Sequence, residues 1–374
     1  MPHHQAIIVG AGPIGLELHV VLKQLGVGVL HLEAGAIGQT ITWYPKQARF
    51  FSSPERIAIA GVPLNTPDQT KATREEYLAY LRSVVQQFGL PVATHEPVRQ
   101  VARLDDGIFS VKTSQRAETC DHLVLAIGDM HLPRELGISG EDLPHVSHYF
   151  DEPHDYFGRN LLIVGGRNSA AEAALRCHRA GANVTLSYRG ESLDDNGIKY
   201  WLLPELKALI KAGEITFFSS TAPTKITNTH VELAAKHQGD RHSCLSTGQE
   251  PDPNHDSASP NDRQECPSPS SFDIPVDHVL LLTGYKQDKT LFEMLGVELV
   301  GENRAPQFDS DTMQTDVPNL YVAGTAAAGT QQRFRLFIEN CHTHAAKIAQ
   351  AITGDAPPLQ YINQAAKTFG LEES

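Results

Sequence analysis

Residues 5–17 read Gln-Ala-Ile-Ile-Val-Gly-Ala-Gly-Pro-Ile-Gly-Leu-Glu, and this stretch decides the fold. A short apolar run, Ala6–Val9, breaks into Gly10, Gly12 and Gly15, and residues at helical spacing follow at once. A strand, then G-x-G-x-x-G, then a helix is typical of a dinucleotide-binding turn. The first glycine permits the tight turn, the second lets the backbone approach a pyrophosphate, and the third lets the helix pack closely on the strand. The phosphates then lie at the helix N-terminus, where free N–H groups and the helix dipole favour negative charge.

The residues after this turn supply the context that a lone glycine motif lacks. A second predicted strand, Gly28–Leu32, ends in Glu33, 23 residues after Gly10. An acid about 20 residues after the turn hydrogen-bonds a ribose hydroxyl in such units. Strand, helix and acid together disfavour the alternative of a glycine-rich turn that holds no ligand. We therefore expect a cofactor with an unphosphorylated ribose, FAD or NAD, in the first unit.

The same architecture returns 155 residues later. The apolar run Asn160–Val164 leads into a second glycine turn, and a helical pattern over Ala171–Arg179 and another strand, Gly181–Tyr188, follow. Two such units in one chain predict two dinucleotide sites. In the second turn an arginine replaces the middle glycine and an alanine, which is an accepted residue, replaces the third. This turn reads Gly165-Gly166-Arg167-Asn168-Ser169-Ala170.

The two units differ most at the end of the second strand. Glu33 closes that strand in the first unit, whereas Arg189 closes it in the second, 24 residues after Gly165. A carboxylate repels a 2′-phosphate, but a guanidinium pairs with it bidentately. We therefore expect the second unit to bind NADPH in preference to NADH. The alternative for Arg189 is a solvated charge at a strand end.

The composition limits the class of protein. A chain of 374 residues is longer than one core usually serves, so two domains are expected. The formal net charge of −13 argues against nucleic acid or an anionic membrane surface as a partner. No apolar run is long enough to span a bilayer, and the first strand begins too early to leave room for a cleaved signal. The five cysteines are odd in number and widely spaced, which favours reduced thiols in the cytoplasm.

The rest of the chain yields further elements. Apolar spacing predicts a helix over Thr73–Phe88 with Thr73 as its cap, and a strand over Val92–Leu104. Residues 236–275 hold six prolines and seven serines, which predicts a disordered insertion at a hairpin tip. The cysteines and histidines of that insertion match no zinc spacing, so no metal site is expected. Near the C-terminus the sequence predicts a strand, Leu320–Ala323, and a helix over Gln332–Ile352.

This pattern resembles the flavoprotein oxidoreductases with two dinucleotide folds, in the branch of thioredoxin reductase. Several short sequence segments resemble the bacillithiol disulfide reductase family more closely. They are Phe50-Phe51-Ser52-Ser53, Gly140-Glu141-Asp142-Leu143-Pro144 with His148-Tyr149-Phe150, Gly165 to Ala170, Tyr188-Arg189-Gly190, Trp201-Leu202-Leu203-Pro204 and Phe337-Ile338-Glu339-Asn340.

The resemblance implies an α/β fold in which an NADPH-binding domain is inserted into a discontinuous FAD-binding domain. The FAD domain would comprise 1–130 and 286–374, and the NADPH domain 131–285. It also implies a homodimer and reduction of a small acceptor such as a low-molecular-weight thiol disulfide. Residues expected at FAD are Gly10, Gly12, Pro13, Ile14, Gly15, Glu33, Ala34, Gln39, Val98, Ala126, Gly128, Gly324 and Thr325. Those expected at NADPH are Gly165, Gly166, Arg167, Asn168, Ser169, Ala170, Tyr188, Arg189 and Gly284.

Three departures from these relatives concern the chemistry. Thioredoxin reductases carry a Cys-x-x-Cys in the NADPH domain, but the stretch His145–Asp155 contains no cysteine. Bacillithiol reductases often place a cysteine between Pro13 and Gly15, where this chain has Ile14. The aspartate that usually follows the C-terminal glycine and bonds the flavin ribitol is Thr325.

No catalytic acid, base or nucleophile follows from the sequence. Cys341 is expected to be a core thiol, and His342 and His344 are candidates for protonating a leaving thiolate, although histidines on a helix are more often structural. Three alternatives to a disulfide reductase remain open. They are a flavin monooxygenase, a ferredoxin–NADP reductase, and a flavin-bound redox sensor without turnover.

Overall fold

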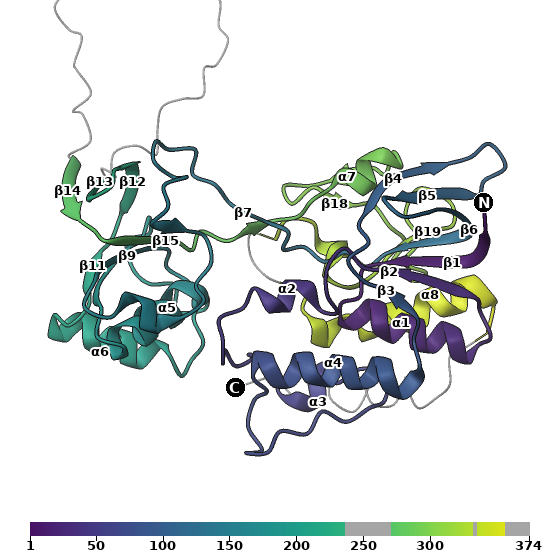
Figure 1. Ribbon diagram of the computed structural model, residues 1–374, viewed down its shortest axis with the longest axis horizontal. Helices are drawn as coiled ribbons and strands as arrows, with labels where there is room; N and C mark the ends of the chain where they lie inside the picture. The colour runs from purple at the N-terminus through teal and green to yellow at the C-terminus, as the bar shows by residue number, and fades with distance from the viewer. Residues whose placement is uncertain (236–270, 332–334, 356–374) are drawn as a thin grey trace, which may run out of the picture. The chain divides into compact units, whose positions relative to one another are not determined.

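The computed structural model describes residues 1–235, 271–331 and 335–355. They form two compact units, each with its own sheet and core. The first unit combines Met1–Arg134 with the described residues from Gly284 onward, so it contains both the purple and the yellow parts of the chain in Figure 1. The second unit is Glu135–Thr283. None of the described helices is both long and apolar enough to cross a membrane.

The first unit is built on a seven-stranded sheet in the order β3-β2-β1-β6-β5-β4, with β19 paired to β6. Strands β1, β2, β3, β6 and β19 run parallel, while β4 and β5 form an antiparallel extension. Strand β6 is long enough to pair with β5 through its first half and with β19 through its second. The strands are β1 His3–Val9, β2 Val29–Leu32, β3 Val92–Ala93, β4 Val98–Arg103, β5 Phe109–Thr113, β6 Ala117–Leu125 and β19 Leu320–Val322.

Helices α1 and α8 lie side by side against this sheet, and α4 packs beyond α1 (Figure 1). The interface of α1 and α8 with the sheet and the interface between α1 and α4 are both apolar, as the buried strands and the amphipathic helices predict. The helices are α1 Pro13–Gln24, α2 Gln39–Thr42, α3 Pro54–Ile57, α4 Arg74–Phe88, α7 Thr290–Met294 and α8 His342–Thr353, with the 3₁₀ turns η2 Gly324–Ala328 and η3 Ile338–Asn340. Two short antiparallel pairs complete the unit: β7 Leu132–Pro133 with β16 Tyr285–Lys286, and β17 Leu299–Val300 with β18 Ala305–Pro306.

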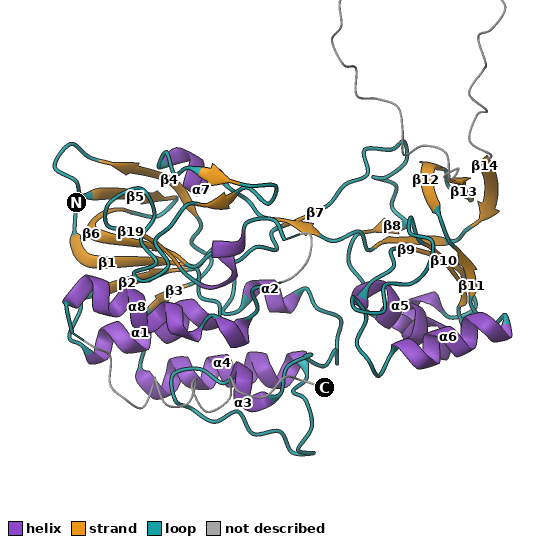
Figure 2. Ribbon diagram, turned by 180° about the vertical axis from the view of Figure 1, so that it is seen from behind, coloured by secondary structure: helices purple, strands orange, loops and turns teal. Residues whose placement is uncertain are grey.

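The second unit has a five-stranded parallel sheet in the order β11-β10-β9-β15-β8 and a three-stranded antiparallel sheet (Figure 2). Separate apolar clusters cover the two faces of the parallel sheet, so its strands are buried on both sides. The parallel strands are β8 Val146–Ser147, β9 Asn160–Val164, β10 Asn183–Ser187, β11 Thr216–Phe218 and β15 His278–Leu281. The others are β12 Thr221–Ile226, β13 His230–Ala235 and β14 Ser271–Pro275, and the helices are α5 Asn168–Arg179, α6 Leu203–Ala212 and the 3₁₀ turn η1 Pro153–Tyr156.

The structure confirms some predicted elements and corrects others. Thr73 and Glu76 form a capping box at the start of α4, as the sequence indicates. The expected strand Val92–Leu104 is two strands, β3 and β4. Residues 271–275 of the expected disordered insertion form β14, which pairs with β13, and 236–270 lie outside the described residues. The C-terminal helix begins at His342 rather than Gln332.

Candidate cofactor and active site

Three turns of the first unit lie at the carboxyl edge of neighbouring parallel strands. The first is the glycine turn after β1, and the others follow β6 and β19. Gly10 has φ +108°, and a methyl group on its Cα would lie 2.4 Å from the carbonyl oxygen of Ala126. A methyl group on Gly15 would lie 2.1 Å from the carbonyl oxygen of Gly10. Only glycine fits either position, so the turns after β1 and β6 lie in direct contact.

Gly12 has a different environment from the other two glycines. Nothing lies within 4 Å of a methyl group placed on it, and its φ of −73° suits any residue. It caps α1, whose first turn contains no acidic residue and receives no side-chain cap. Free backbone N–H groups beside an open glycine are the arrangement that binds a phosphate at a helix N-terminus. This space fits the pyrophosphate that the sequence predicts.

Glu33 lies at the end of β2 and is 7% exposed. Its Oε2 accepts the N–H of Ala11 at 2.6 Å, and its Oε1 accepts the N–H of Gly35 at 2.8 Å. Burial raises the pKa of this carboxyl, and the backbone donors oppose that rise. An ionised carboxylate offers about four acceptor positions, so two remain for ribose hydroxyl groups. The carboxylate is therefore placed beside the glycine turn and does not face bulk water.

A buried histidine pair beneath the turn is a feature that the sequence analysis missed. The Nε2 of His31 lies 2.9 Å from the carbonyl oxygen of Gly10, and its Nδ1 lies 3.0 Å from the Nδ1 of His19. Burial lowers the pKa of His31 to about 4 and that of His19 to about 3, so both rings are neutral at pH 7. His31 therefore donates to Gly10 through Nε2 and accepts from His19 at Nδ1, which fixes the turn from below.

The remaining predicted FAD residues divide into two groups. Pro13 begins α1, and the side chain of Ile14 packs against Gly324. Ala34 is exposed next to Glu33, and Gln39 Oε1 accepts the N–H of Ala36 at 2.8 Å. These residues surround the turn. Val98 belongs to β4 and packs on the apolar core of the unit.

A polar cluster joins the turns after β6 and β19. The Nε2 of Gln287 donates to the carbonyl oxygens of Gly128 and Ala326, both at 2.9 Å. Its Oε1 is buried and has no hydrogen-bond partner among the described residues. Asp129 is 7% exposed, and the Nε2 of Gln331 donates to its Oδ2 at 2.9 Å. An unpaired buried acceptor and a buried carboxyl at this edge fit a ligand that carries hydroxyl or imide N–H groups.

The second unit repeats the glycine turn after β9. A methyl group on Gly165 would lie 2.6 Å from the carbonyl oxygen of Leu282 and 3.0 Å from the Cβ of Ala170, so alanine in the third position packs closely against the turn. A methyl group on Gly166 would overlap the ring of Tyr188, at 2.3 Å. Tyr188 therefore lies flat against the turn. Gly284, which the resemblance placed at NADPH, belongs to the first unit.

The polar and charged residues predicted at NADPH lie at the start of α5 and at the end of β10. Arg167 caps this helix and pairs with Asp194, its Nε lying 3.4 Å from Oδ2. Asn168 accepts the N–H of Lys199 at 2.9 Å, and Ser169 is exposed. Arg189 is exposed at the end of β10 and forms no hydrogen bond or ion pair with any described residue. An unpaired guanidinium at this place fits a ribose 2′-phosphate.

The whole chain is similar to characterised reductases. It is 34% identical over 352 residues to bacilliredoxin reductase Bdr of Bacillus subtilis, which covers 94% of this chain and 98% of that protein. The solved bacillithiol disulfide reductase Bdr of Staphylococcus aureus is 31% identical, with a TM-score of 0.82 over 95% of this chain and 99% of its own. Residues 7–255 match the family described as pyridine nucleotide-disulphide oxidoreductase. The chain belongs to this family.

As a pyridine nucleotide-disulphide oxidoreductase, the protein is an FAD-dependent enzyme that uses NADPH. A thioredoxin reductase of T. acidophilum, 18% identical, shares the fold with a TM-score of 0.67 over 95% of this chain. The fold predicted from the two glycine turns is therefore confirmed. The open space at Gly12 and the unpaired acceptor oxygen of Gln287 fit FAD in the first unit.

The described cysteines of this oxidoreductase are not reactive thiols. Cys120, Cys177 and Cys341 are fully buried, and burial raises the pKa of each to about 12. A thiol with such a pKa contains almost no thiolate at pH 7 and cannot attack a disulfide. Cys341 is a core residue, as the sequence indicates. Cys244 and Cys266 lie outside the described residues, and among those described no cluster of histidine, cysteine and acidic residues is suited to a metal.

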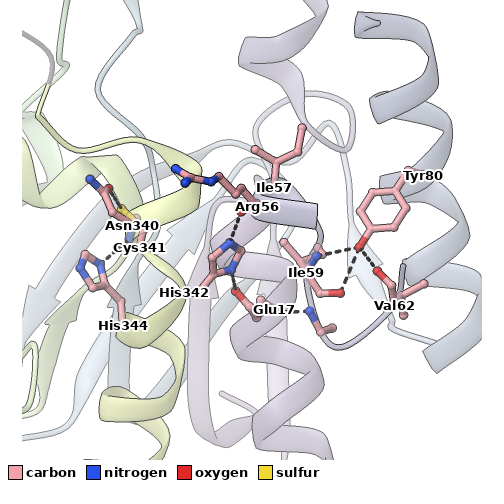
Figure 3. Close-up of polar contacts among 12 residues, drawn as sticks. Glu17, Arg56, Ile57, Ile59, Val62, Tyr80, Asn340, Cys341, His342 and His344 are labelled. Carbon is pink, nitrogen blue, oxygen red and sulfur yellow. Dashed lines mark hydrogen bonds and ion pairs between the residues drawn. The ribbon is translucent and has the colours of Figure 1, made fainter. Parts of the chain in front are cut away.

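The two candidate histidines of α8 are held by structural bonds (Figure 3). His342 Nδ1 lies 2.7 Å from Oε2 of Glu17, and its Nε2 lies 2.8 Å from the carbonyl oxygen of Arg56. The other carboxylate oxygen of Glu17 accepts the N–H of Ala60 at 3.0 Å. His344 accepts the N–H of Gly324 through Nδ1, and burial lowers its pKa to about 4. His342 thus joins α8 to α1 and to α3.

Removing either partner of the Glu17–His342 pair is expected to destabilise the first unit. Burial alone would lower the pKa of His342, but the charge of Glu17 and the bonds to Glu17 and Arg56 raise it overall. A raised folded-state pKa adds stability that is complete below about pH 6.5 and disappears as the pH rises through the folded pKa. His342→Ala should cost about 3–5 kcal/mol at pH 6, because it leaves a buried charge unpaired.

Urea unfolding of wild type and His342→Ala across pH 5–9 measures this cost. The difference between the two proteins should shrink as the pH rises. Glu17→Gln is the second variant, and Gln350→Ala, on the exposed side of the same helix, is the control that should change little. A cost that does not vary with pH would show that His342 acts only by packing.

Proposed function

We propose that this enzyme oxidises NADPH and reduces a low-molecular-weight thiol disulfide of the bacillithiol class. The observation that carries the proposal is the full-length similarity to the Bdr proteins of B. subtilis and S. aureus, the second of which is named a bacillithiol disulfide reductase. We further propose that the enzyme works in the cytoplasm, where thiol pools are kept reduced. A homodimer is part of the same proposal and is tested by its mass in solution.

The residues assigned to FAD are those of the first unit. The turn from Gly10 to Gly15 would hold the pyrophosphate, and Glu33 would accept the ribose hydroxyls. Gly128, Gly324 and Thr325 would line the inner part of the site. When bound, FAD accepts a hydride equivalent from NADPH and passes two electrons to the acceptor. The protein's own contribution is to bind, to orient and to exclude water.

The residues assigned to NADPH are those of the second unit. Gly165, Gly166 and the start of α5 would hold the pyrophosphate, and Tyr188 lies against that turn. Arg189 is assigned to the 2′-phosphate because it is exposed and has no partner among the described residues. Arg167 already pairs with Asp194 and is the less available cation.

Replacing Arg189 with alanine should raise KM for NADPH about 10- to 100-fold and leave KM for NADH nearly unchanged. This rise in KM corresponds to the loss of one charge-assisted hydrogen bond, which contributes about 1.5–3 kcal/mol of binding free energy. The measurement is steady-state kinetics with both nucleotides and a saturating acceptor. Arg179→Ala is the charge-matched control, because Arg179 lies in the last turn of α5 and pairs with Glu205. Equal effects of Arg189→Ala on the two nucleotides would refute the assignment.

The acceptor is identified by NADPH oxidation with a panel of oxidants. We expect turnover with a low-molecular-weight thiol disulfide such as bacillithiol disulfide, and little with oxygen, ferredoxin or oxidised thioredoxin. Cys341→Ser should keep this turnover, because the Cys341 thiol is buried and protonated. Fast oxygen consumption would refute the proposal in favour of a monooxygenase. Electron transfer to ferredoxin would favour a ferredoxin reductase, and no turnover with any acceptor would favour a redox sensor.

A further inference from the structure

The loop between β10 and α6 lies against the start of α5, the helix assigned to the NADPH pyrophosphate. Gly197 of this β10–α6 loop accepts the N–H of Asn168 at 3.0 Å, and Asn168 Oδ1 accepts the N–H of Lys199 at 2.9 Å. Leu193 and Ile198 anchor the loop, because both are buried in the apolar core of the second unit. The loop is therefore bonded to the first residue of α5 through both its backbone and its side chain.

Asp194 of the same loop forms an ion pair with Arg167, which caps α5 and takes the position of the middle glycine. The Nε of Arg167 lies 3.4 Å from Oδ2 of Asp194. Both side chains pack on Gly197: a methyl group there would lie 2.7 Å from the Asp194 carboxylate and 3.2 Å from Cγ of Arg167. The carboxylate thus lies beside the helix N-terminus at which a dinucleotide places its pyrophosphate.

The ion pair is weak enough to be exchanged for a stronger one. The side chains of Arg167 and Asp194 are 44% and 33% exposed, and ion pairs at such exposed places contribute little free energy. A pyrophosphate carries more negative charge and more acceptor oxygens than a carboxylate, so it can take the guanidinium over. The carboxylate left behind repels the pyrophosphate only slightly, because water and salt screen charges at the surface.

The glycine turn of the first unit has a different environment. Nothing lies within 4 Å of a methyl group on Gly12, so the start of α1 is open to its ligand. At the start of α5, by contrast, Gly197 already accepts one backbone N–H and Asp194 holds the cation. An open turn suits a flavin that stays bound. A turn whose cation is partly neutralised suits a nucleotide that must enter as NADPH and leave as NADP⁺ in each cycle.

We propose that Asp194 sets the affinity of the second unit for pyridine nucleotides by competing with their pyrophosphate for Arg167. This inference rests on the proposed function. Arg167 passes from the carboxylate to the pyrophosphate when a nucleotide binds, and it returns when NADP⁺ leaves. Asp194 is therefore a positioning residue that acts through Arg167. Because the pyrophosphate is common to both nucleotides, Asp194 acts on NADP⁺ and NAD⁺ alike, whereas Arg189 is assigned to the 2′-phosphate alone.

The affinity is measured by calorimetric titration of the oxidised, FAD-loaded enzyme with NADP⁺ and with NAD⁺. Asp194→Asn should lower both Kd values about 10-fold, mainly through slower dissociation. Asp194→Glu keeps the charge and should bind much as the wild type does. Asp195→Asn is the matched control, because it removes the neighbouring carboxylate, which pairs with Lys207 of α6, and should change neither Kd. A merely structural role for Asp194 would weaken binding in Asp194→Asn instead of strengthening it.

A double-variant cycle tests whether Asp194 acts through Arg167. Arg167→Met should raise both Kd values about 10-fold, and adding Asp194→Asn to it should lower them by less than about 3-fold. An Asp194→Asn protein that binds NADP⁺ no tighter than the wild type would overturn the inference alone. The full gain in affinity without Arg167 would overturn it too. A wild type that binds neither nucleotide would instead refute the NADPH site of the proposed function.

Discussion

Gly15→Ala is expected to abolish FAD binding and to destabilise the first unit by about 3 kcal/mol or more. The added methyl group would lie 2.1 Å from the carbonyl oxygen of Gly10 and 3.2 Å from the Cβ of Ala126. The first of these is a backbone atom that the His31 bond and the β1–β2 pairing hold in place. The turn and α1 must therefore move apart, which removes the helix N-terminus from the site.

Urea unfolding of the first unit and the absorbance of copurified flavin measure the two effects of Gly15→Ala. Gly28→Ala is the control, because Gly28 is exposed at the opposite edge of the sheet and a methyl group there meets only the Gln5 side chain, at 3.4 Å. A Gly15→Ala protein that is as stable as the wild type and yellow as purified would show that the close packing of α1 on β1 is not required.

Gly12→Ala should separate cofactor binding from folding. No atom lies within 4 Å of the new methyl group, and the backbone of Gly12 is extended, so stability without FAD should change by less than about 0.5 kcal/mol. The methyl group occupies the space assigned to the pyrophosphate. We expect a loss of about 3 kcal/mol of binding energy, or more than about 100-fold in the Kd for FAD.

Flavin fluorescence quenching on titration of the FAD-free protein measures the Kd for Gly12→Ala. The same Gly28→Ala control should bind FAD as the wild type does. An unchanged Kd in Gly12→Ala would place the pyrophosphate elsewhere. A lower stability without FAD would show instead that the space above Gly12 is filled by the protein.

The sequence predicts those parts of the fold that local pattern determines. The two glycine turns, the strands beside them and the Thr73 cap follow from spacing and residue type, and Glu33 follows from its distance to Gly10. The start of the C-terminal helix does not follow, because side chains compete for the backbone before it. Gln331 accepts the N–H groups of Arg335 and Leu336, and Asn340 accepts that of Phe337, so the helix begins only at His342.

The polar residues of the site are predictable only in part. Asp129 and Gln331 meet across 202 positions of sequence, and neither belongs to a motif. From the sequence, His31 is only one residue of a short alternating strand, although its ring bonds the carbonyl oxygen of Gly10 in the glycine turn. Such contacts arise from the packing of β1, β6 and β19 at one edge, which residue spacing does not reveal. The signal that could have indicated Asp129 is an acid next to the glycine that ends a buried strand.

The central claim is that electrons pass from NADPH through FAD to the disulfide without a redox-active thiol among the residues that the structure describes. Anaerobic reductive titration of the FAD-loaded enzyme, followed by stepwise addition of bacillithiol disulfide, tests it most directly. We predict that one two-electron equivalent of reductant per flavin removes the oxidised-flavin absorbance completely, and that one equivalent of disulfide restores it. Uptake of a second two-electron equivalent per flavin, or a flavin that stays reduced in excess disulfide, would contradict the account.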